Sequence, residues 1–318
     1  MIYKISAEEN GKTVKEILRY GVGLSLAFTK RLKFLDNGIM LNGNRVTVRA
    51  TVKEGDLLFL ATEDVDNATD LTPTDLPLSI IYEDEHIVLP NKSANMPTHP
   101  SHNHRGDTLA DALAYKYQQS DSAFVFRSIS RLDKNTSGIL LIAKDRISAS
   151  KLSASMKNGE IKKQYLTILE GELSGEGTVD TYIRRAQESI IFREVCSADE
   201  GGDRAITKYR VICSKNGYSL VIASPITGRT HQLRVHFAHL GTPILSDDLY
   251  GRPSELLDRH ALHAVSLSFT HPQTQKSMSF FAPPSEDIKR TVVKLFGDST
   301  LDFLTELEKQ LCKQTENE

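Results

Sequence analysis

Ser-Arg-Leu-Asp-Lys-Asn-Thr-Ser-Gly-Ile-Leu-Leu-Ile-Ala, at residues 130–143, is the stretch that decides the fold. Its second part, residues 139–143, is an unbroken apolar run of strand length, which predicts a central strand covered on both faces. The polar loop before it carries charges, hydroxyl groups and one glycine. We therefore expect Asp133 to stand at the mouth of a central strand, where a rigid element can support a reactive group.

Taken alone, the loop also fits an ordinary turn in which Asp133 and Asn135 bond their own backbone. A second polar block, far along the chain, favours a functional site. Residues 228–236 read Gly-Arg-Thr-His-Gln-Leu-Arg-Val-His and fall almost entirely within a predicted helix at 229–240, which a glycine follows. Together with Arg-Leu-Asp-x-x-Thr-Ser-Gly at 131–138, this block resembles the paired signatures of RNA pseudouridine synthases of the RluA/RluD type.

The resemblance extends over residues 78–284 and implies a fold class. This is an α+β pseudouridine synthase fold, with a largely antiparallel, bent mixed sheet and a central cleft, for a catalytic domain at 78–297. RNA would lie across the cleft, and lysines and arginines would meet its phosphates. The candidates for these contacts are Lys162, Lys163, Arg184 and Arg185.

The reaction of this family gives Asp133 its expected role. Uridine becomes pseudouridine when the bond from ribose to the ring nitrogen breaks, the uracil rotates, and ring carbon C5 joins the ribose. Nothing is oxidised and no group leaves, so no cofactor is expected, and an ionised carboxylate can attack the ribose or stabilise its cation. By the family pattern Asp133 does this, and Arg229 is the opposite charge that orients it and keeps it ionised.

The family pattern assigns roles to three further residues. Tyr165, in Lys-x-Tyr at 163–165, would stack on the uracil and assist proton removal from C5; by itself the residue also fits a core aromatic with a tethered hydroxyl. Leu233 would form the floor of the base pocket. A uridine that leaves its RNA stack leaves a gap, and Arg131 is placed to fill it.

Two positions depart from the family pattern. Ser130 stands where most members have histidine, and we expect it to tune RNA contacts because the rest of the signature is intact. Residues 91–96, Asn-Lys-Ser-Ala-Asn-Met, resemble the opening motif Asn-Lys-Pro-Ala-Gly-Met with changes at Ser93 and Asn95. Asparagine is the best substitute for glycine at positive φ, so we expect this turn to be kept.

Residues 1–62 are expected to form a small α/β RNA-binding domain. They carry ten lysines and arginines against six acidic residues, a net charge of +4. Helical spacing of apolar residues predicts two short helices near 14–18 and 28–35, and Asn42-Gly43 predicts a hairpin between 39–41 and 46–48. This order resembles the RNA-binding domain first known from ribosomal protein S-four. Lys30, Arg31 and Lys33 would face RNA, although a merely solvated basic helix face is the alternative.

An acidic linker is expected at 63–77, because residues 63–85 hold eight acidic residues, two prolines and no lysine or arginine. Residues 298–318 are expected to form a charged helical tail. Within the catalytic domain, a helix should begin after Asp145, and Asn216-Gly217 should join two strands in a hairpin.

Composition and cysteine use are those of an ordinary globular protein, with 39% hydrophobic and 25% charged residues and a net charge of -2. No apolar run reaches membrane-spanning length, no signal-peptide pattern begins the chain, and three widely spaced cysteines favour reduced thiols. We therefore expect a cytoplasmic protein with no membrane partner. Histidines cluster at 99–104 and 231–239, but neither cluster has an acidic residue or cysteine to complete a ligand set, so no metal is expected.

The sequence as a whole favours an RNA pseudouridine synthase, an isomerase that acts as a monomer. Large-subunit ribosomal RNA is the expected substrate, because ribosomal members of the family often carry the accessory domain, and transfer RNA is the alternative. A catalytically silent RNA-binding or ribosome-assembly protein is a second class, against which the presence of Asp133 and Arg229 argues. A phosphotransferase using Asp-Lys-Asn-Thr at 133–136 is a third, but that chemistry needs magnesium carboxylates at defined positions.

Overall fold

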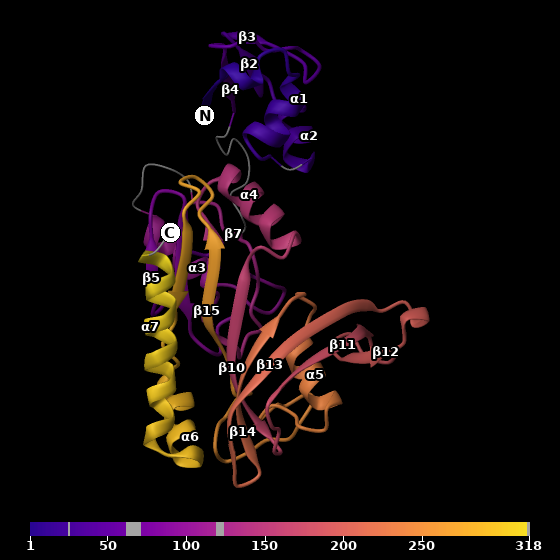
Figure 1. Cartoon of the computed structure of the whole chain (residues 1–318), viewed down its shortest axis with the longest axis vertical. Coiled ribbons are helices and arrows are strands. Elements are labelled where there is room, and N and C mark those ends of the chain that lie inside the picture. The colour runs from indigo at the N-terminus through magenta and orange to yellow at the C-terminus, as the bar shows by residue number, and fades with distance from the viewer. Residues whose placement is uncertain (25, 62–70, 119–123, 317–318) are drawn as a thin grey trace.

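The computed structural model describes residues 1–24, 26–61, 71–118 and 124–316 (Figure 1). A small N-terminal domain stands at one end of a larger α+β body, and the two last helices run along the side of that body. None of the helices in these ranges has the length and apolar character that crossing a membrane requires.

The N-terminal domain packs a four-stranded sheet on two short helices. Its elements are β1 (Ile2–Lys4), α1 (Val14–Glu16), α2 (Leu26–Phe34), β2 (Ile39–Leu41), β3 (Asn44–Arg45) and β4 (Leu57–Leu60), with sheet order β1-β4-β2-β3. A π-helical turn at Ile17–Gly21 continues α1. The hairpin at Asn42-Gly43 is present, with both residues at positive φ. Its second strand starts at Asn44 and not at 46, because a two-residue turn pairs Leu41 directly with Asn44.

The core of the N-terminal domain includes one residue from the larger body. Val14, Leu18 and Leu32 are almost fully buried, and Ile147 of α4 (Arg146–Lys157) joins their cluster. The domain therefore rests on the helix that follows the Asp133 loop and its strands.

The larger body is built on one 12-stranded sheet, mostly antiparallel, with strand order β12-β11-β13-β14-β10-β15-β8-β6-β9-β7, to which β16 and β5 add at the sides. Among the strands that the structure describes, only β15 and β8 pair in parallel. The strands are β5 (Ser79–Glu83), β6 (Ile87–Lys92), β7 (Arg127–Ser128), β8 (Ser137–Ile139), β9 (Ile142–Ala143), β10 (Lys162–Glu170), β11 (Glu176–Arg185), β12 (Arg193–Cys196), β13 (Asp203–Lys215), β14 (Tyr218–Pro225), β15 (Leu262–Thr270) and β16 (Ser277–Phe281). The prediction of a largely antiparallel mixed sheet is confirmed.

The apolar run 139–143 is buried as predicted, but it is not one unbroken strand. It forms parts of β8 and β9, which pair with β6 in the same register. Between them Leu140 donates its N–H to the carbonyl of Pro90 at 3.1 Å, and Pro90 has no N–H to return. The proline therefore interrupts the ladder opposite the middle of the run.

The described residues of the body also form the α-helices α3 (Leu109–Tyr117), α4, α5 (Gln232–His239), α6 (Glu286–Phe296) and α7 (Asp302–Glu316). Asp145 caps α4 as predicted, since its side chain accepts a hydrogen bond from the backbone N–H of Ser148. The helix predicted at 229–240 begins only at Gln232. His231 has φ of 56°, in the left-handed region, so the chain turns there before the helix starts.

The expected linker and tail are partly described. Residues 62–70 of the chain lie outside the described residues, whereas 71–77 run beside α3, where Thr72 donates its N–H to Asp111 at 2.8 Å. In the tail, α7 buries Leu304 and Leu307 in the main core, so this helix is packed on the body.

Candidate active site

A cleft of about 670 Å³ opens between the Asp133 loop, the end of α4, β10 and the turn before α5. Six of the expected site residues line it: Arg131, Asp133, Lys163, Tyr165, Arg229 and Leu233. They come from segments up to 102 positions apart (131 to 233), so the fold brings them to one place. Lys30, Arg31 and Lys33 lie elsewhere, on α2 of the N-terminal domain.

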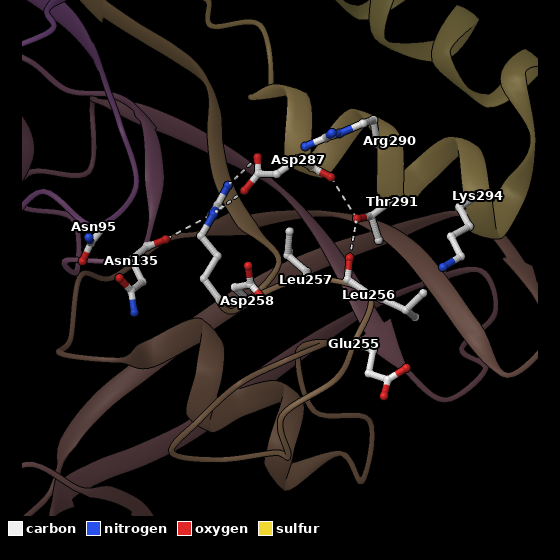
Figure 2. A pocket seen from close by; sticks show the side chains of 11 residues that line it. Asn95, Asn135, Glu255, Leu256, Leu257, Asp258, Asp287, Arg290, Thr291 and Lys294 are labelled. Carbon is white, nitrogen blue, oxygen red and sulfur yellow. Dashed lines mark hydrogen bonds and ion pairs between the residues drawn. The ribbon is translucent and has the colours of Figure 1, made fainter.

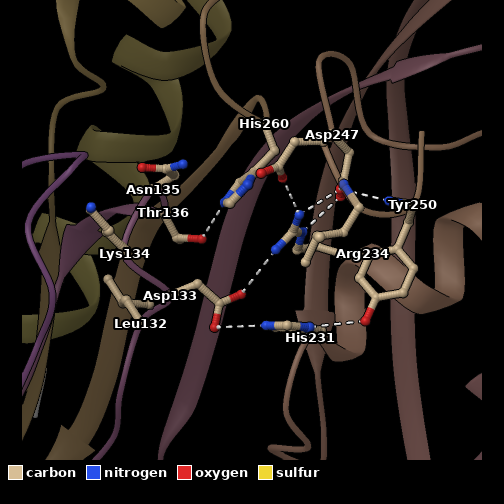
Figure 3. A network of polar contacts seen from close by, with 12 residues as sticks. Leu132, Asp133, Lys134, Asn135, Thr136, His231, Arg234, Asp247, Tyr250 and His260 are labelled. Atoms are coloured by element: carbon tan, nitrogen blue, oxygen red, sulfur yellow. Dashed lines mark hydrogen bonds and ion pairs between the residues drawn. The ribbon is translucent and has the colours of Figure 1, made fainter. Parts of the chain in front are cut away.

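The carboxylate of Asp133 faces two cationic or potentially cationic groups (Figure 3). Nη1 of Arg234 lies 4.0 Å from Oδ2, and Nε2 of His231 lies 4.0 Å from Oδ1. Arg234 is only 4% exposed, and its other nitrogens donate to Asp247 at 2.5 and 2.7 Å and to Asp248 at 2.7 Å. The arginine is therefore held rigidly while one nitrogen points at Asp133.

Arg229 does not form the expected ion pair with Asp133. Its guanidinium lies at the cleft mouth, 39% exposed, with Nη1 3.7 Å from Asp203. The cause is the turn before α5: Gln232 accepts the backbone N–H of Arg229 at 3.0 Å, and His231 adopts its left-handed conformation. Arg234, in the first turn of α5, reaches Asp133 instead.

Aromatic and imidazole groups surround this ion pair. His231 shares a hydrogen bond of 2.9 Å with the hydroxyl of Tyr250, and Arg234 lies over the Tyr250 ring at 5.3 Å. His260 contacts the hydroxyl of Thr136 at 2.8 Å. Burial lowers the pKa of His231, and it lowers the pKa of His260 to about 3. Both imidazoles are therefore neutral at physiological pH, whereas Arg234 is a buried and permanent positive charge 4.0 Å from Asp133.

The backbone of the Asp133 loop is fixed by hydrogen bonds to four successive carbonyls. The carbonyls of residues 132–135 accept, in order, from the hydroxyl of Thr98 at 2.9 Å, the N–H of Thr136 at 3.1 Å, Nζ of Lys92 at 3.1 Å and Nη1 of Arg259 at 3.0 Å. Because all four of these carbonyls are bonded, the backbone that carries Asp133 is held in place before any substrate arrives.

Two buried cations carry part of that support. Lys92 is 1% exposed and also donates to the carbonyls of Ser93 and Met96, each at 2.8 Å. Burial, with a smaller contribution from the charge of Arg259, lowers the pKa of Lys92 to about 7. Arg259 in turn pairs with Asp287 at the start of α6, and a cavity of about 530 Å³ lies on this side of the loop (Figure 2). The loop is thus tied to the C-terminal helices as well as to β6.

Tyr165 stands in the wall of the cleft on β10. A bulge between Gln164 and Tyr165 shifts the pairing of β10 with β15 at this point, which changes the direction of the side chain. The ring packs against both main apolar clusters, and burial, together with the charge of Asp133, raises the pKa of its hydroxyl. Within the described ranges, no protein group bonds that hydroxyl.

The remaining cleft residues combine an apolar floor with cationic walls. Leu233 is 5% exposed and belongs to the main core. Lys163 has a pKa lowered by burial, whereas Arg131 is exposed beside Asp133. In the expected histidine clusters, His236 bonds two threonine hydroxyls, and the described part of the chain contains no group of three or more potential ligands arranged for a metal.

The turn at 91–96 also carries a feature of the predicted motif. Asn95 has φ of 59°, so asparagine adopts the conformation that glycine would take, as predicted. This turn lies beside the Asp133 loop, where Lys92 joins the two through its hydrogen bonds.

The chain is similar to known proteins over most of its length. A family model described as RNA pseudouridylate synthase matches residues 86–239. YjbO of Bacillus subtilis, described as an uncharacterized RNA pseudouridine synthase, is 38% identical over 281 residues, covering 88% of this chain and 98% of that protein. Ribosomal large subunit pseudouridine synthase D of Xylella fastidiosa is 33% identical over 279 residues, 83% of each chain.

Among solved structures, the human protein RNA Pseudouridylate Synthase Domain Containing 1 superposes with a TM-score of 0.56 at 26% identity, covering 73% of this chain and 95% of that one. The expected fold class and enzyme class are thereby confirmed. With relatives of this similarity spanning most of its length, the chain belongs to the RNA pseudouridine synthase family, whose members are isomerases.

Proposed function

We propose that this enzyme converts one or a few uridines of large-subunit ribosomal RNA to pseudouridine, with Asp133 acting at the ribose. The observation that carries the proposal is the position of Asp133, on a loop whose carbonyls at 132–135 are all bonded, and 4.0 Å from the buried charge of Arg234. Several bacterial relatives bear the name ribosomal large subunit pseudouridine synthase D, which supports the choice of RNA. The same relatives support action in the cytoplasm.

The chemistry follows from a carboxylate at ribose C1′. The bond from C1′ to N1 breaks with its electron pair moving into the uracil, while Asp133 attacks C1′ or stabilises the ribose cation. The freed ring rotates and C5 bonds to C1′. C5 then loses its proton and N1 gains one, so atoms and charges balance without a cofactor. Arg234 keeps the carboxylate oriented throughout.

Tyr165 and Leu233 are the residues that would hold the base. The Tyr165 ring offers a flat face in the cleft wall, and Leu233 gives an apolar floor. Because the pKa of Tyr165 is raised, its hydroxyl stays protonated at neutral pH and is available as a hydrogen-bond donor to the rotating ring. In this assignment Tyr165 guides the base and carries out no proton abstraction as an anion.

Arg229, Arg131 and Lys163 would meet the RNA backbone and the vacated stack. Nε of Arg229 donates to the carbonyl of Arg204 at 3.1 Å, and its Nη1 faces Asp203, which is 72% exposed, at 3.7 Å. An exposed arginine at the cleft mouth suits a phosphate contact. Arg131 lies two residues from Asp133, where it can occupy the space that the flipped uridine leaves.

The N-terminal domain would add a second RNA contact. A groove of about 290 Å³ is lined by Lys15, Arg19, Leu26, Thr29, Lys30, Lys33 and Phe34. Phe34 is 78% exposed and Tyr20 is 74% exposed, with Arg19 over the Tyr20 ring at 5.3 Å. Cations alternating with exposed rings suit single-stranded RNA, whose bases stack on aromatic faces.

The test is pseudouridine mapping by carbodiimide labelling and primer extension on total RNA from cells with and without this protein. Loss of one or a few sites in large-subunit ribosomal RNA, restored by the purified protein on the corresponding transcript, is expected. Loss only of transfer RNA sites would contradict the proposed target, and an unchanged map would contradict the activity.

A further inference from the structure

The loop between β11 and β12 carries three successive large apolar side chains at the surface. Ile190, Ile191 and Phe192 are 82%, 58% and 39% exposed. Single exposed apolar residues are common on proteins, but a contiguous group with polar neighbours marks an interaction site. We call residues 187–192 the hairpin tip.

The hairpin tip is a built structure that turns these side chains outward. Ser189 accepts the backbone N–H groups of Ile191 and Phe192 at 3.1 and 3.0 Å. Nη1 of Arg193 donates to the carbonyls of Ile190, Ile191 and Phe192 at 3.4, 3.3 and 3.0 Å. These bonds fix the backbone of the tip from within; Ile190 and Ile191 turn outward, whereas Phe192 also packs against Tyr250.

Two side chains, Tyr250 and His231, connect the hairpin tip to the Asp133 carboxylate. The ring of Phe192 is 5.7 Å from that of Tyr250, whose hydroxyl accepts the backbone N–H of Arg193 at 2.9 Å. The same hydroxyl contacts His231, and His231 lies 4.0 Å from Asp133. A molecule that places a uridine at Asp133 and extends along this side of the cleft would meet the tip.

Charge near the hairpin tip identifies the kind of molecule. Residues 184–193 contain three arginines and one glutamate, a net charge of +2. Glu194 and Glu200 pair with Arg184, so Arg185 and Arg193 are the cations that flank the tip. Apolar side chains flanked by cations are what proteins insert between base steps of nucleic acids, with the cations on the phosphates. A protein partner would not explain why the tip is tied to the active site.

We infer that the hairpin tip is an apolar wedge that enters the RNA stack next to the target uridine and holds its neighbours apart. The inference rests on the proposed function and extends it to the form of the substrate: the uridine lies in structured, stacked RNA. The wedge lowers the cost of unstacking before the uridine enters the cleft. Arg131 acts inside the cleft, and the tip acts on the flanking bases.

The test compares two transcripts that contain the mapped uridine. One is its ribosomal stem-loop, and the other has the pairing strand changed so that the uridine is unpaired. The triple variant Ile190→Ser, Ile191→Ser, Phe192→Ser should lower single-turnover kcat/KM on the stem-loop about tenfold or more, because unstacking costs a few kcal/mol. On the unpaired strand it should act like the unmodified enzyme. Tyr115→Ser, which removes an exposed ring on α3, is the matched control and should act normally on both.

A second measurement uses 2-aminopurine beside the target uridine in the stem-loop, with Asp133→Asn added to prevent turnover. Binding should raise its fluorescence with an intact tip and not with the triple variant. The wedge would be overturned if the triple variant were as active on the stem-loop as the unmodified enzyme, or if it lost the same activity on both transcripts. It would also be overturned if light scattering showed that the unmodified enzyme is a dimer and the triple variant a monomer. If the unmodified enzyme acts on neither transcript while the fluorescence rise depends on the tip, the proposed function fails and the wedge stands.

Discussion

Nη1 of Arg234 lies 4.0 Å from Oδ2 of Asp133, and the fold holds it there through Asp247 and Asp248. Burial raises the pKa of Asp247, but the hydrogen bonds and charge of Arg234 outweigh this effect and keep that pKa below its usual value. A permanently ionised pair thus stands behind the candidate nucleophile. The positive charge of Arg234 that faces Asp133 is therefore part of the folded core.

Arg234 and Arg229 should therefore respond differently to substitution. Arg234→Met leaves a buried Asp247 unpaired, so we expect the free energy of unfolding to fall by about 3–5 kcal/mol. Arg229→Met removes an exposed side chain, so stability should change by less than about 0.5 kcal/mol while KM for RNA rises. Urea unfolding and steady-state kinetics measure both.

Arg234→Lys keeps the charge but loses the bidentate contact with Asp247. We expect this variant to fold and to have a lower kcat, with a smaller change in KM. If Arg229→Met instead lowers kcat by orders of magnitude at unchanged KM, then Arg229 acts on Asp133 during the reaction and the assignment of Arg234 is wrong.

The pKa of Lys92 gives a prediction about stability and pH. Its pKa is about 7 in the folded protein and near 10.5 when unfolded, so between these values the unfolded chain binds more protons. The contribution of Lys92 to stability therefore rises with pH across this window and is at its minimum below pH 7. The slope is at most about 1.4 kcal/mol per pH unit.

Lys92→Met removes this titration without leaving a cavity. The measurement is the free energy of unfolding of the unmodified protein minus that of Lys92→Met, from pH 6.5 to 9.5. This difference should rise with pH, because the contributions of the other titrating groups cancel in it. Lys294→Met, on the outer part of α6, is the control and should give a flat difference. A flat difference for Lys92→Met as well would mean that Lys92 titrates normally.

The basic residues of α2 should contribute to RNA affinity through phosphates. Substitution of Lys30, Arg31 and Lys33 by alanine should weaken binding and reduce the slope of log K against log salt by about 1 for each phosphate that these side chains no longer neutralise. Fluorescence anisotropy at several salt concentrations measures this. Alanine at Lys289, Lys294 and Lys309, on the C-terminal helices, changes the net charge equally and should leave the slope unchanged. If both triple variants reduced the salt slope equally, the weaker binding would be due to net charge alone.

Local sequence signals predicted much of the framework. Asn42-Gly43 and Asn216-Gly217 both form hairpin turns at positive φ, and Asp145 begins α4, because these structures depend on neighbouring residues only. The two signatures also line one cleft, as the resemblance implied. The strand predicted at 139–143, by contrast, is interrupted by Pro90, which lies on the neighbouring strand β6. A pattern local to 139–143 does not reveal this pairing.

The arrangement of charges inside the site could not be predicted in the same way. Arg229 and Arg234 stand five positions apart in one motif, and the choice between them depends on the left-handed His231, which a helix predicted over 229–240 does not include. Lys92 lies within the opening motif, and Arg259 closely precedes a buried strand. Their role emerges only when three distant segments meet at the carbonyls of residues 134 and 135. The sequence signal available for Lys92 and Arg259 was that each is a charged residue close to an apolar strand.

The most direct test of the account replaces one oxygen of the candidate nucleophile. Asp133→Asn keeps the size of the side chain and the bonded loop, so RNA affinity should change little, since phosphate contacts dominate binding. In cells that lack the protein, this variant should fail to restore any pseudouridine that the unmodified protein restores, and the purified variant should show no detectable turnover on the transcript. Restoration of those sites by Asp133→Asn would contradict the role of Asp133.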